Sequence, residues 1–193
     1  MELKAPRAGE RRVLASSHRR CLYEQPFYYS DGKGREKEET YSFWGYQGTM
    51  PVIIFPVTDE GHVIAIRQFR HCLNNFLIET PGGLPKHREQ PPEEVARAEL
   101  LEETGYEPAD VVVYPKIQFD GMIDAHFTPC IGFGCIRTNK TKLDRTEVLE
   151  TILMPIREWY EKIQRGEINT DAKYFALSLL ALPLLKERLG FSL

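Results

Sequence analysis

The sequence of 193 residues predicts a mixed α/β fold (α+β), with a small antiparallel β unit ahead of the main domain. Short apolar runs bounded by turn residues predict strands at 51–57, 62–69 and 76–80. A segment with both a helix-start and a helix-stop signal lies between Pro91 and Gly105. Two more helical segments close the chain, so strands and helices alternate in a mixed α/β order.

An N-terminal extension is predicted at 1–48, ahead of the main domain at 49–193. Its first ~20 residues are polar, and we expect this part to be poorly ordered. Aromatic residues are then dense from Tyr23 to Tyr46, with a turn signal at 30–34 between them. This pattern predicts two or three strands that form the small antiparallel β unit.

The main domain begins with a predicted hairpin. The apolar runs 51–57 and 62–69 are joined by Asp59-Glu60-Gly61, which is a turn sequence. The strand at 76–80 leads into Pro81-Gly82-Gly83, where the glycines are free to adopt positive φ. A tight turn is therefore predicted shortly before the first helix.

The second half of the chain continues the alternation. Strands are predicted at 111–114, 127–136 and 148–154, followed by helices at 155–164 and from about 170 to 189. Asn169 or Thr170 is expected to cap the last helix. Its expected apolar positions are Phe175, Leu179, Leu180 and Leu182.

The most informative segment is the predicted helix that ends at Gly105. Pro92 suits its first turn, as do the acids that follow, because the N-terminus of a helix is positive. Glu99, Glu102 and Glu103 stand at i, i+3 and i+4 and so share one face. Like charges repel, and a hard cation such as Mg²⁺ gives a physical reason to hold them together. The alternative is a solvated acidic face.

Composition narrows the class of protein. The net charge of −3 argues against binding to a nucleic-acid backbone, which favours a basic patch. The longest apolar runs are too short for a membrane span, and the N-terminus shows no signal peptide. The four cysteines have neither CxxC nor zinc spacing, so we expect reduced and mostly buried thiols in a cytoplasmic protein.

Together with the glycine turn before it, the acidic helix resembles the Nudix box. The pattern of that box is G-x5-E-x7-R-E-U-x-E-E-x-G-U, where U is an apolar residue. The stretch from Gly83 to Glu89 fits the first part, and the stretch from Glu99 to Tyr106 fits the last part.

The chain departs from this pattern by one residue. Counted back from Gly105, Ala98 stands where the family has an arginine, and Gln90 stands where it has the loop glutamate. In the family that arginine is thought to orient the catalytic glutamates. Arg97 lies one residue early, which is about 100° of rotation on a helix, so it cannot simply replace the missing side chain.

The flanking sequence is similar to ADP-ribose pyrophosphatases. Residues 66–71 (IRQFRH) resemble their RQYRH stretch, 78–83 (IETPGG) resemble ELPAG, and 166–173 (GEINTDAK) resemble GxIxDAKT. The resemblance covers roughly residues 40–185 and implies the Nudix fold, a mixed β-sheet sandwiched between helices. It also implies a homodimer, because these enzymes dimerise through an aromatic N-terminal extension.

The resemblance assigns roles residue by residue. Glu99, Glu103 and the backbone carbonyl of Gly82 would hold Mg²⁺, with Mn²⁺ left open. Glu102 and Glu103 would act in catalysis. For the substrate cleft it implies Arg67 and Glu79. The loop that carries the family's general base has no glutamate here, so Asp120, Asp124 or a box glutamate could act instead, and Asp124 is our choice.

The implied reaction is metal-dependent hydrolysis of a nucleoside diphosphate linked to another moiety. ADP-ribose is the leading substrate and would give AMP and ribose 5-phosphate, by attack of a metal-activated water on the diphosphate. Two alternatives stay open. One is a pyrophosphatase for another nucleotide sugar or dinucleotide, and the other is a nucleotide-binding Nudix module with little or no activity.

Overall fold

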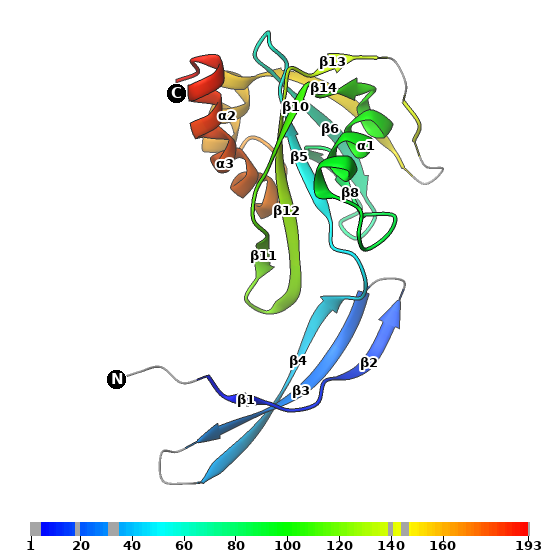
Figure 1. Ribbon diagram of the computed structural model, residues 1–193, viewed down its shortest axis with the longest axis vertical. Helices are drawn as coiled ribbons and strands as arrows, with labels where there is room; N and C mark the ends of the chain where they lie inside the picture. The colour runs from blue at the N-terminus through cyan, green and yellow to red at the C-terminus, as the bar shows by residue number, and fades with distance from the viewer. Residues whose placement is uncertain (1–4, 18–19, 31–34, 139–140, 144–146, 193) are drawn as a thin grey trace. The chain divides into compact units, whose positions relative to one another are not determined.

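The computed structural model describes residues 5–17, 20–30, 35–138, 141–143 and 147–192 (Figure 1). The chain forms two compact units. The N-terminal unit takes in residues 1–50 and also 118–126, and the main unit takes in 51–117 and 127–193.

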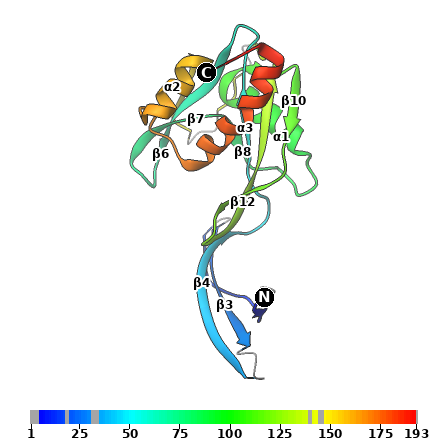
Figure 2. The ribbon, with the colours of Figure 1, turned by 90° about the vertical axis from the view of Figure 1, so that its left-hand side faces the viewer.

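The N-terminal unit is an antiparallel sheet. Its strands are β1 (Arg7–Ala8), β2 (Arg12–Ser17), β3 (Arg20–Ser30) and β4 (Glu36–Tyr46), and β3 pairs with each of the other three. Figures 1 and 2 show β3 and β4 side by side as long, curved strands. The beginning of β12 (Ile123–Phe133) adds a parallel pairing to β4, and β11 (Ile117–Asp120) pairs with β12.

The poor order expected of the first residues stays a prediction for the N-terminal segment. Strands β1 and β2 lie within it, and every residue of both strands is exposed. Backbone pairing to β3 therefore holds them, and no buried apolar face contributes. Without such a face the sequence carries no period-2 signal for these strands.

The main unit is built on a mixed sheet whose central strand is β5 (Val52–Pro56), buried along its whole length. β5 runs parallel to the second half of β12 and antiparallel to β8 (Gly82–Gly83). β10 (Asp110–Val113) pairs with the other edge of β12. Full burial of β5 means that both faces of the sheet are covered, as expected for a strand that reads as one continuous apolar run.

A second, antiparallel sheet has the order β14 (Leu149–Pro155), β6 (His62–Arg70) and β7 (Asn75–Glu79). The turn of the hairpin predicted between β5 and β6 is present, since the Thr58 N–H donates to the carbonyl of His62 at 2.9 Å. Only the bridge between Val57 and Val63 continues it, and the two strands then enter different sheets. β9 (Tyr106–Glu107) and β13 (Ile136–Arg137) form a short separate pair.

Within the described part of the chain, three helices cover these sheets, namely α1 (Pro92–Thr104), α2 (Ile156–Arg165) and α3 (Ala172–Leu189). Helix α1 packs on β5 and β8, α3 packs on β5, and α2 packs on β6 and β14. Figure 1 shows α1 on one side of the sheets and the other two helices on the opposite side. The predicted arrangement, a mixed sheet sandwiched between helices, is confirmed. None of the helices in the described ranges combines the length and apolar content that a membrane span requires.

The last helix differs from its prediction in cap and in buried face. Asp171 is the N-cap, with its carboxylate accepting the Lys173 N–H at 3.1 Å, while the Asn169 side chain donates to the Phe76 carbonyl at 2.8 Å. Leu179 is exposed. The buried side chains are Tyr174, Leu177, Ser178, Ala181 and Leu185. Leucine is so frequent on this helix that two of its faces look apolar in the sequence. The buried face is the one that carries Ser178, whose hydroxyl accepts a hydrogen bond from the Trp159 indole at 3.0 Å.

The cysteines are free thiols, as predicted. Cys21, Cys130 and Cys135 are buried, and Cys72 is exposed. Burial raises the pKa of Cys130 and of Cys135 to about 12, so both stay protonated and unreactive near neutral pH.

Candidate active site

Helix α1 presents its glutamates as the spacing predicts. It ends at Gly105, which takes a left-handed conformation (φ 74°) and donates its N–H to the Leu101 carbonyl. The helix buries the side chains of Val95, Ala96 and Leu100 on its apolar side. Glu103 is buried as well, with 5% of its surface exposed, although it is an acid. A buried carboxylate needs compensation from its surroundings, and here the backbone N–H of Gly82 supplies part of it.

The tight turn predicted at 81–83 is wrong, because Gly82 and Gly83 form strand β8, paired with β5, and neither has a positive φ. This short strand, for which the name glycine turn is kept, lies directly against two glutamates of α1. The Gly82 N–H donates to Oε2 of Glu103 at 3.2 Å. A Cβ on Gly83 would overlap the carboxylate of Glu99, and a Cβ on Gly82 would lie 2.6 Å from the Val52 carbonyl oxygen. At Gly82 only glycine lets the two backbones approach so closely, whereas a side chain at Gly83 would displace the Glu99 carboxylate. The turn and the helix thus bring Glu99, Glu103 and Gly82 together, which are the residues that the resemblance assigns to the metal.

The raised pKa of Glu103 indicates that a third carboxylate, that of Glu147, lies near Glu99 and Glu103. The pKa of Glu103 lies well above its ordinary value, first because the group is buried, and then because Glu99 and Glu147 repel its charge. Glu99, Glu103 and Glu147 are called the carboxylate cluster below. Sequence reasoning missed Glu147, which lies two residues before β14. Its only signal was an acid just ahead of a predicted strand.

Glu102 lies at the edge of this cluster and is partly exposed. Its carboxylate accepts from the Lys86 ammonium group at 3.2 Å. The Lys86 backbone N–H in turn donates to Oε1 of Gln90 at 2.8 Å. Gln90, which stands at the position of the family's loop glutamate when counted back from Gly105, therefore holds the loop that carries a positive charge to Glu102.

Arg97 does not replace the arginine missing at position 98. Its guanidinium pairs with Glu93, one turn earlier on α1, at 2.9 Å, and donates to the Pro108 carbonyl beyond the helix. The one-residue rotation has turned this side chain toward the loop after α1, as the helix geometry requires. The positive charge that lowers the pKa of Glu103 comes instead from Arg70 on β6.

The structure separates Arg67 and Glu79, which were predicted to line one cleft. Arg67 pairs with Ile78 across the β6–β7 ladder, and Glu79 pairs with Ile66, so the two side chains point to opposite faces. Glu79 is fully buried and accepts from Nε of Arg70 at 3.0 Å through each of its oxygens. Burial alone would lower the pKa of Arg70, but the hydrogen bonds to Glu79 outweigh it and raise that pKa.

Arg67 is exposed over 46% of its side chain. Its guanidinium pairs with Glu150 on β14 at 3.0 Å and lies over the ring of Phe76, 4.2 Å from the centroid. Nothing in these contacts commits Arg67 to the core, so its charge remains accessible to a ligand.

Asp124, predicted as the general base, belongs to the N-terminal unit. Its carboxylate pairs with the guanidinium of Arg11, which also lies over the rings of Tyr23 and Phe43. Residue 45 opposite it is glycine, where a Cβ would lie 3.0 Å from the Asp124 carbonyl oxygen. These contacts define a structural environment for Asp124, and its role in catalysis stays a prediction.

The donors of the carboxylate cluster fit a magnesium ion. Among the described residues, no group of three or more His, Cys, Asp or Glu side chains is placed to hold a metal by itself. Mg²⁺ does not need such a cage, because it is usually held by one or two carboxylates and completes its shell with water and substrate phosphates. Glu99 and Glu103, which repel one another beside the backbone of Gly82, provide the one or two carboxylates that Mg²⁺ requires. Mn²⁺ accepts the same types of ligand.

A helix that presents glutamates to a pair of glycines, on a mixed sheet between helices, is the arrangement that the resemblance implies for a Nudix hydrolase. The family model of the NUDIX domain matches residues 49–176, which is more than half of the chain. The chain belongs to the Nudix family and is a Nudix pyrophosphohydrolase.

Individual relatives agree with the family. An ADP-ribose pyrophosphatase from Bacillus subtilis (strain 168) is 27% identical over 136 residues, which cover 68% of this chain and 71% of the relative. An uncharacterised Nudix hydrolase from Schizosaccharomyces pombe is 43% identical over 53 residues, 28% of this chain and 25% of that protein. The crystal structure of an ADP compounds hydrolase superposes with a TM-score of 0.81 at 18% identity and covers 97% of this chain and 98% of its own, which shows the fold.

Proposed function

We propose that this protein uses Mg²⁺ to hydrolyse ADP-ribose to AMP and ribose 5-phosphate. The observation that carries the proposal is the carboxylate cluster on the glycine turn, because a divalent cation would balance its repelling charges and would in turn bind a diphosphate. The Bacillus subtilis relative is an ADP-ribose pyrophosphatase, which supports the choice of substrate.

In this mechanism Glu99, Glu103 and the carbonyl of Gly82 would hold the ion. When bound, the ion neutralises the diphosphate and makes a coordinated water more acidic. Glu103 is fixed by burial and by the Gly82 N–H, so its carboxylate does not have to reorganise when substrate arrives. Glu102, tied to Lys86, borders the same face of α1.

Arg67 remains a proposed contact to the substrate, but it lies on the face of β6 opposite to Arg70, whose charge acts on Glu103, so it would meet a phosphate that extends beyond the carboxylate cluster. Its guanidinium can form charge-assisted bonds with phosphate oxygens. Releasing its exposed partner Glu150 costs little, because exposed ion pairs contribute only about 0–1 kcal/mol. Glu79 is proposed to act on the same side as Arg70, whose guanidinium it holds in place at the base of the site.

Glu147 is the proposed general base. It is the carboxylate of the cluster that the metal assignment leaves unused, and it is close enough to Glu103 to raise the pKa of that group. Asp124 remains the competing proposal, and its ion pair with Arg11 would have to open before it could accept a proton from water.

Two neutral variants separate these proposals. Glu147→Gln is expected to lower kcat by about 10²- to 10⁴-fold, the usual contribution of a general base, with little change in KM. Asp124→Asn is expected to keep kcat within a few-fold. Steady-state kinetics on ADP-ribose checks both, with thermal melting as the control for folding. A full loss in Asp124→Asn together with an active Glu147→Gln would return the role to Asp124.

The substrate is tested on a panel. The purified protein is incubated with ADP-ribose, another ADP-sugar, a dinucleoside diphosphate and a nucleoside triphosphate, each with Mg²⁺ or with EDTA, and released monophosphate is measured. We expect AMP from ADP-ribose with Mg²⁺ and none with EDTA. A faster reaction with another compound would favour the alternative pyrophosphatase. Absence of product from every diphosphate would favour the binding module.

The N-terminal unit is the proposed surface for a homodimer. It exposes large apolar side chains on its strands, including Trp44 with 56% of its surface exposed, Val13, Leu14 and Tyr41. Apolar groups gathered on one small sheet are typical of a surface that a partner covers. Light scattering is expected to give twice the 22.3 kDa of one chain. A mass of one chain would refute the dimer.

A further inference from the structure

A second pocket lies in the main unit, with a volume of about 350 Å³. Its walls come from the turn between β5 and β6 and from β9, β13 and β14. The lining residues are Thr58, Glu60, His62, Tyr106, Cys135, Ile136, Arg137 and Leu153. None of them belongs to the carboxylate cluster or to the glycine turn, and the proposed hydrolysis uses none of them. The volume is within the usual range for small-molecule sites, about 300–1,000 Å³.

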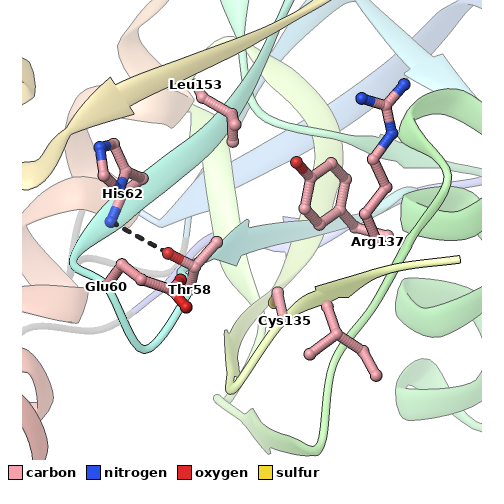
Figure 3. Close-up of a pocket in the computed structure, with 8 residues that line it drawn as sticks. Thr58, Glu60, His62, Cys135, Arg137 and Leu153 are labelled. Carbon is pink, nitrogen blue, oxygen red and sulfur yellow. Dashed lines mark hydrogen bonds between the residues drawn. The ribbon is translucent and has the colours of Figure 1, made fainter.

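Backbone hydrogen bonds hold the walls of this pocket. The turn at Thr58 is closed by the Gly61 N–H to the Thr58 carbonyl, and the His62 N–H also donates to the Thr58 hydroxyl at 3.3 Å (Figure 3). Across the pocket, Arg137 and Tyr106 are paired residues of the β13–β9 ladder. The backbone that carries the lining side chains is therefore held by hydrogen bonds and ladder pairing on both sides of the pocket.

The walls between these ends are largely apolar. Ile136 is exposed over 66% of its surface and Leu153 over 48%, although both are aliphatic. The ring of Tyr106 and the protonated thiol of Cys135 complete this lining. Water against such groups is displaced favourably by an apolar ligand, at about 25 cal/mol per Å² of surface covered.

The charges of the pocket are divided between two sides. Figure 3 shows Glu60, His62 and Thr58 on one side and Arg137 on the other. Hydrogen bonds from its own backbone and from Thr58 lower the pKa of Glu60, which is therefore negative at neutral pH. In the ranges that the structure describes, no carboxylate lies within ion-pair distance of the Arg137 guanidinium.

We propose that this pocket binds a small molecule with a flat apolar body and one anionic group, such as an aromatic carboxylate or phosphate. The anionic group pairs with Arg137, because Glu60 repels it from the opposite side. The flat body lies between Leu153, Ile136 and Tyr106. This site is additional to the hydrolytic one and takes no part in cleaving a diphosphate.

Binding is tested with benzoate as the probe, titrated into the ¹⁵N-labelled full chain and followed by two-dimensional NMR. We expect saturable shifts at the amides of 58–62, 106, 135–137 and 153. Benzamide has the same ring without the charge and is expected to bind at least about tenfold more weakly, because a hydrogen bond to a charged group is worth more than that factor. Phenyl phosphate is the second anion and is expected to shift the same amides.

Matched variants test the assigned residues. Arg137→Gln is expected to weaken benzoate binding at least about tenfold. Leu153→Trp fills the pocket from a half-exposed position that the core does not need, and saturable shifts should disappear. Arg165→Gln, which removes an exposed arginine from the end of α2, should bind benzoate like the unaltered chain.

Three results would overturn the proposal: equal binding of benzoate and benzamide, undiminished binding in Arg137→Gln, or shifts that fall on α1 and the glycine turn instead. No part of the measurement requires turnover. Failure of ADP-ribose hydrolysis would leave it unaffected, and failure of benzoate binding would leave the hydrolase intact.

Discussion

Glu103→Gln is expected to abolish turnover and, at the same time, to stabilise the metal-free protein. Glu103 is buried among carboxylates, so its ionised form is costly to the fold while no cation is present. Glutamine has the same shape and can still accept the Gly82 N–H, but carries no charge. Loss of a proposed metal ligand should lower kcat by about 10³-fold or more, since the ion supplies several kcal/mol to the reaction.

The pH dependence of this stability has a definite sign. The pKa of Glu103 is higher in the folded protein than in the unfolded chain, so the folded state holds its proton longer. Stability is therefore lost as pH rises above the ordinary range of a glutamate and through the raised pKa. Thermal melting in EDTA should show Glu103→Gln melting above the unaltered protein at pH 8 and close to it at pH 4.

Glu94→Gln is the matched control, because it removes an exposed acid from the first turn of the same helix. It loses a favourable interaction with the helix dipole, worth about 0.3–1 kcal/mol, so its stability should fall slightly. Addition of Mg²⁺ should raise the melting temperature of the unaltered protein and of Glu94→Gln more than that of Glu103→Gln. A Glu103→Gln protein that melts lower in EDTA at pH 8 would contradict the burial argument.

Arg70→Met is expected to cause the largest loss of stability. It leaves Glu79, which is fully buried, without its partner. Breaking a buried pair costs about 3–5 kcal/mol, and since Arg70 is 37% exposed we expect the lower end, about 3 kcal/mol. At about 2–4 °C per kcal/mol for a domain of this size, the melting temperature should fall by roughly 6–12 °C.

Arg67→Met makes a close comparison, since it removes an arginine three residues earlier on the same strand. Its partner Glu150 is exposed, so the expected loss is below about 1 kcal/mol. Combining Arg70→Met with Glu79→Leu should recover most of the stability, because a buried pair replaced by apolar groups is often neutral. Equal losses in Arg70→Met and Arg67→Met would mean that Glu79 is not held by Arg70.

Local patterns predicted the parts of this protein that depend on neighbours in the chain. Strand β5, helix α1 and the stop at Gly105 each follow from a few adjacent residues. The three glutamates follow from helical spacing alone. Glu147 could not be found in this way, because a long stretch of chain separates it from Glu103 and only the packing of β14 brings them together.

Other differences have the same origin. Strand β2 buries no apolar face and is held by its pairing with β3, and a local sequence pattern does not identify that partner strand. The separation of Arg67 and Glu79 depends on the register between β6 and β7, and a register shift of one residue would reverse it. The cleft shared by Arg67 and Glu79 was inferred from motifs. A motif gives the types of residue at each position but does not say to which face of the sheet their side chains point.

Strand β12 has a consequence for how the protein is made. The sheet of the N-terminal unit includes residues 118–126, and Ile123 and Asp124 pair with Trp44 and Gly45 of β4. Strands β1 to β4 therefore leave the ribosome long before the strand that completes them. During synthesis the edge of β4 stays open while the glycine turn and helix α1 are being added. Strands β1 to β4 are thus completed by a strand that is synthesised well after them.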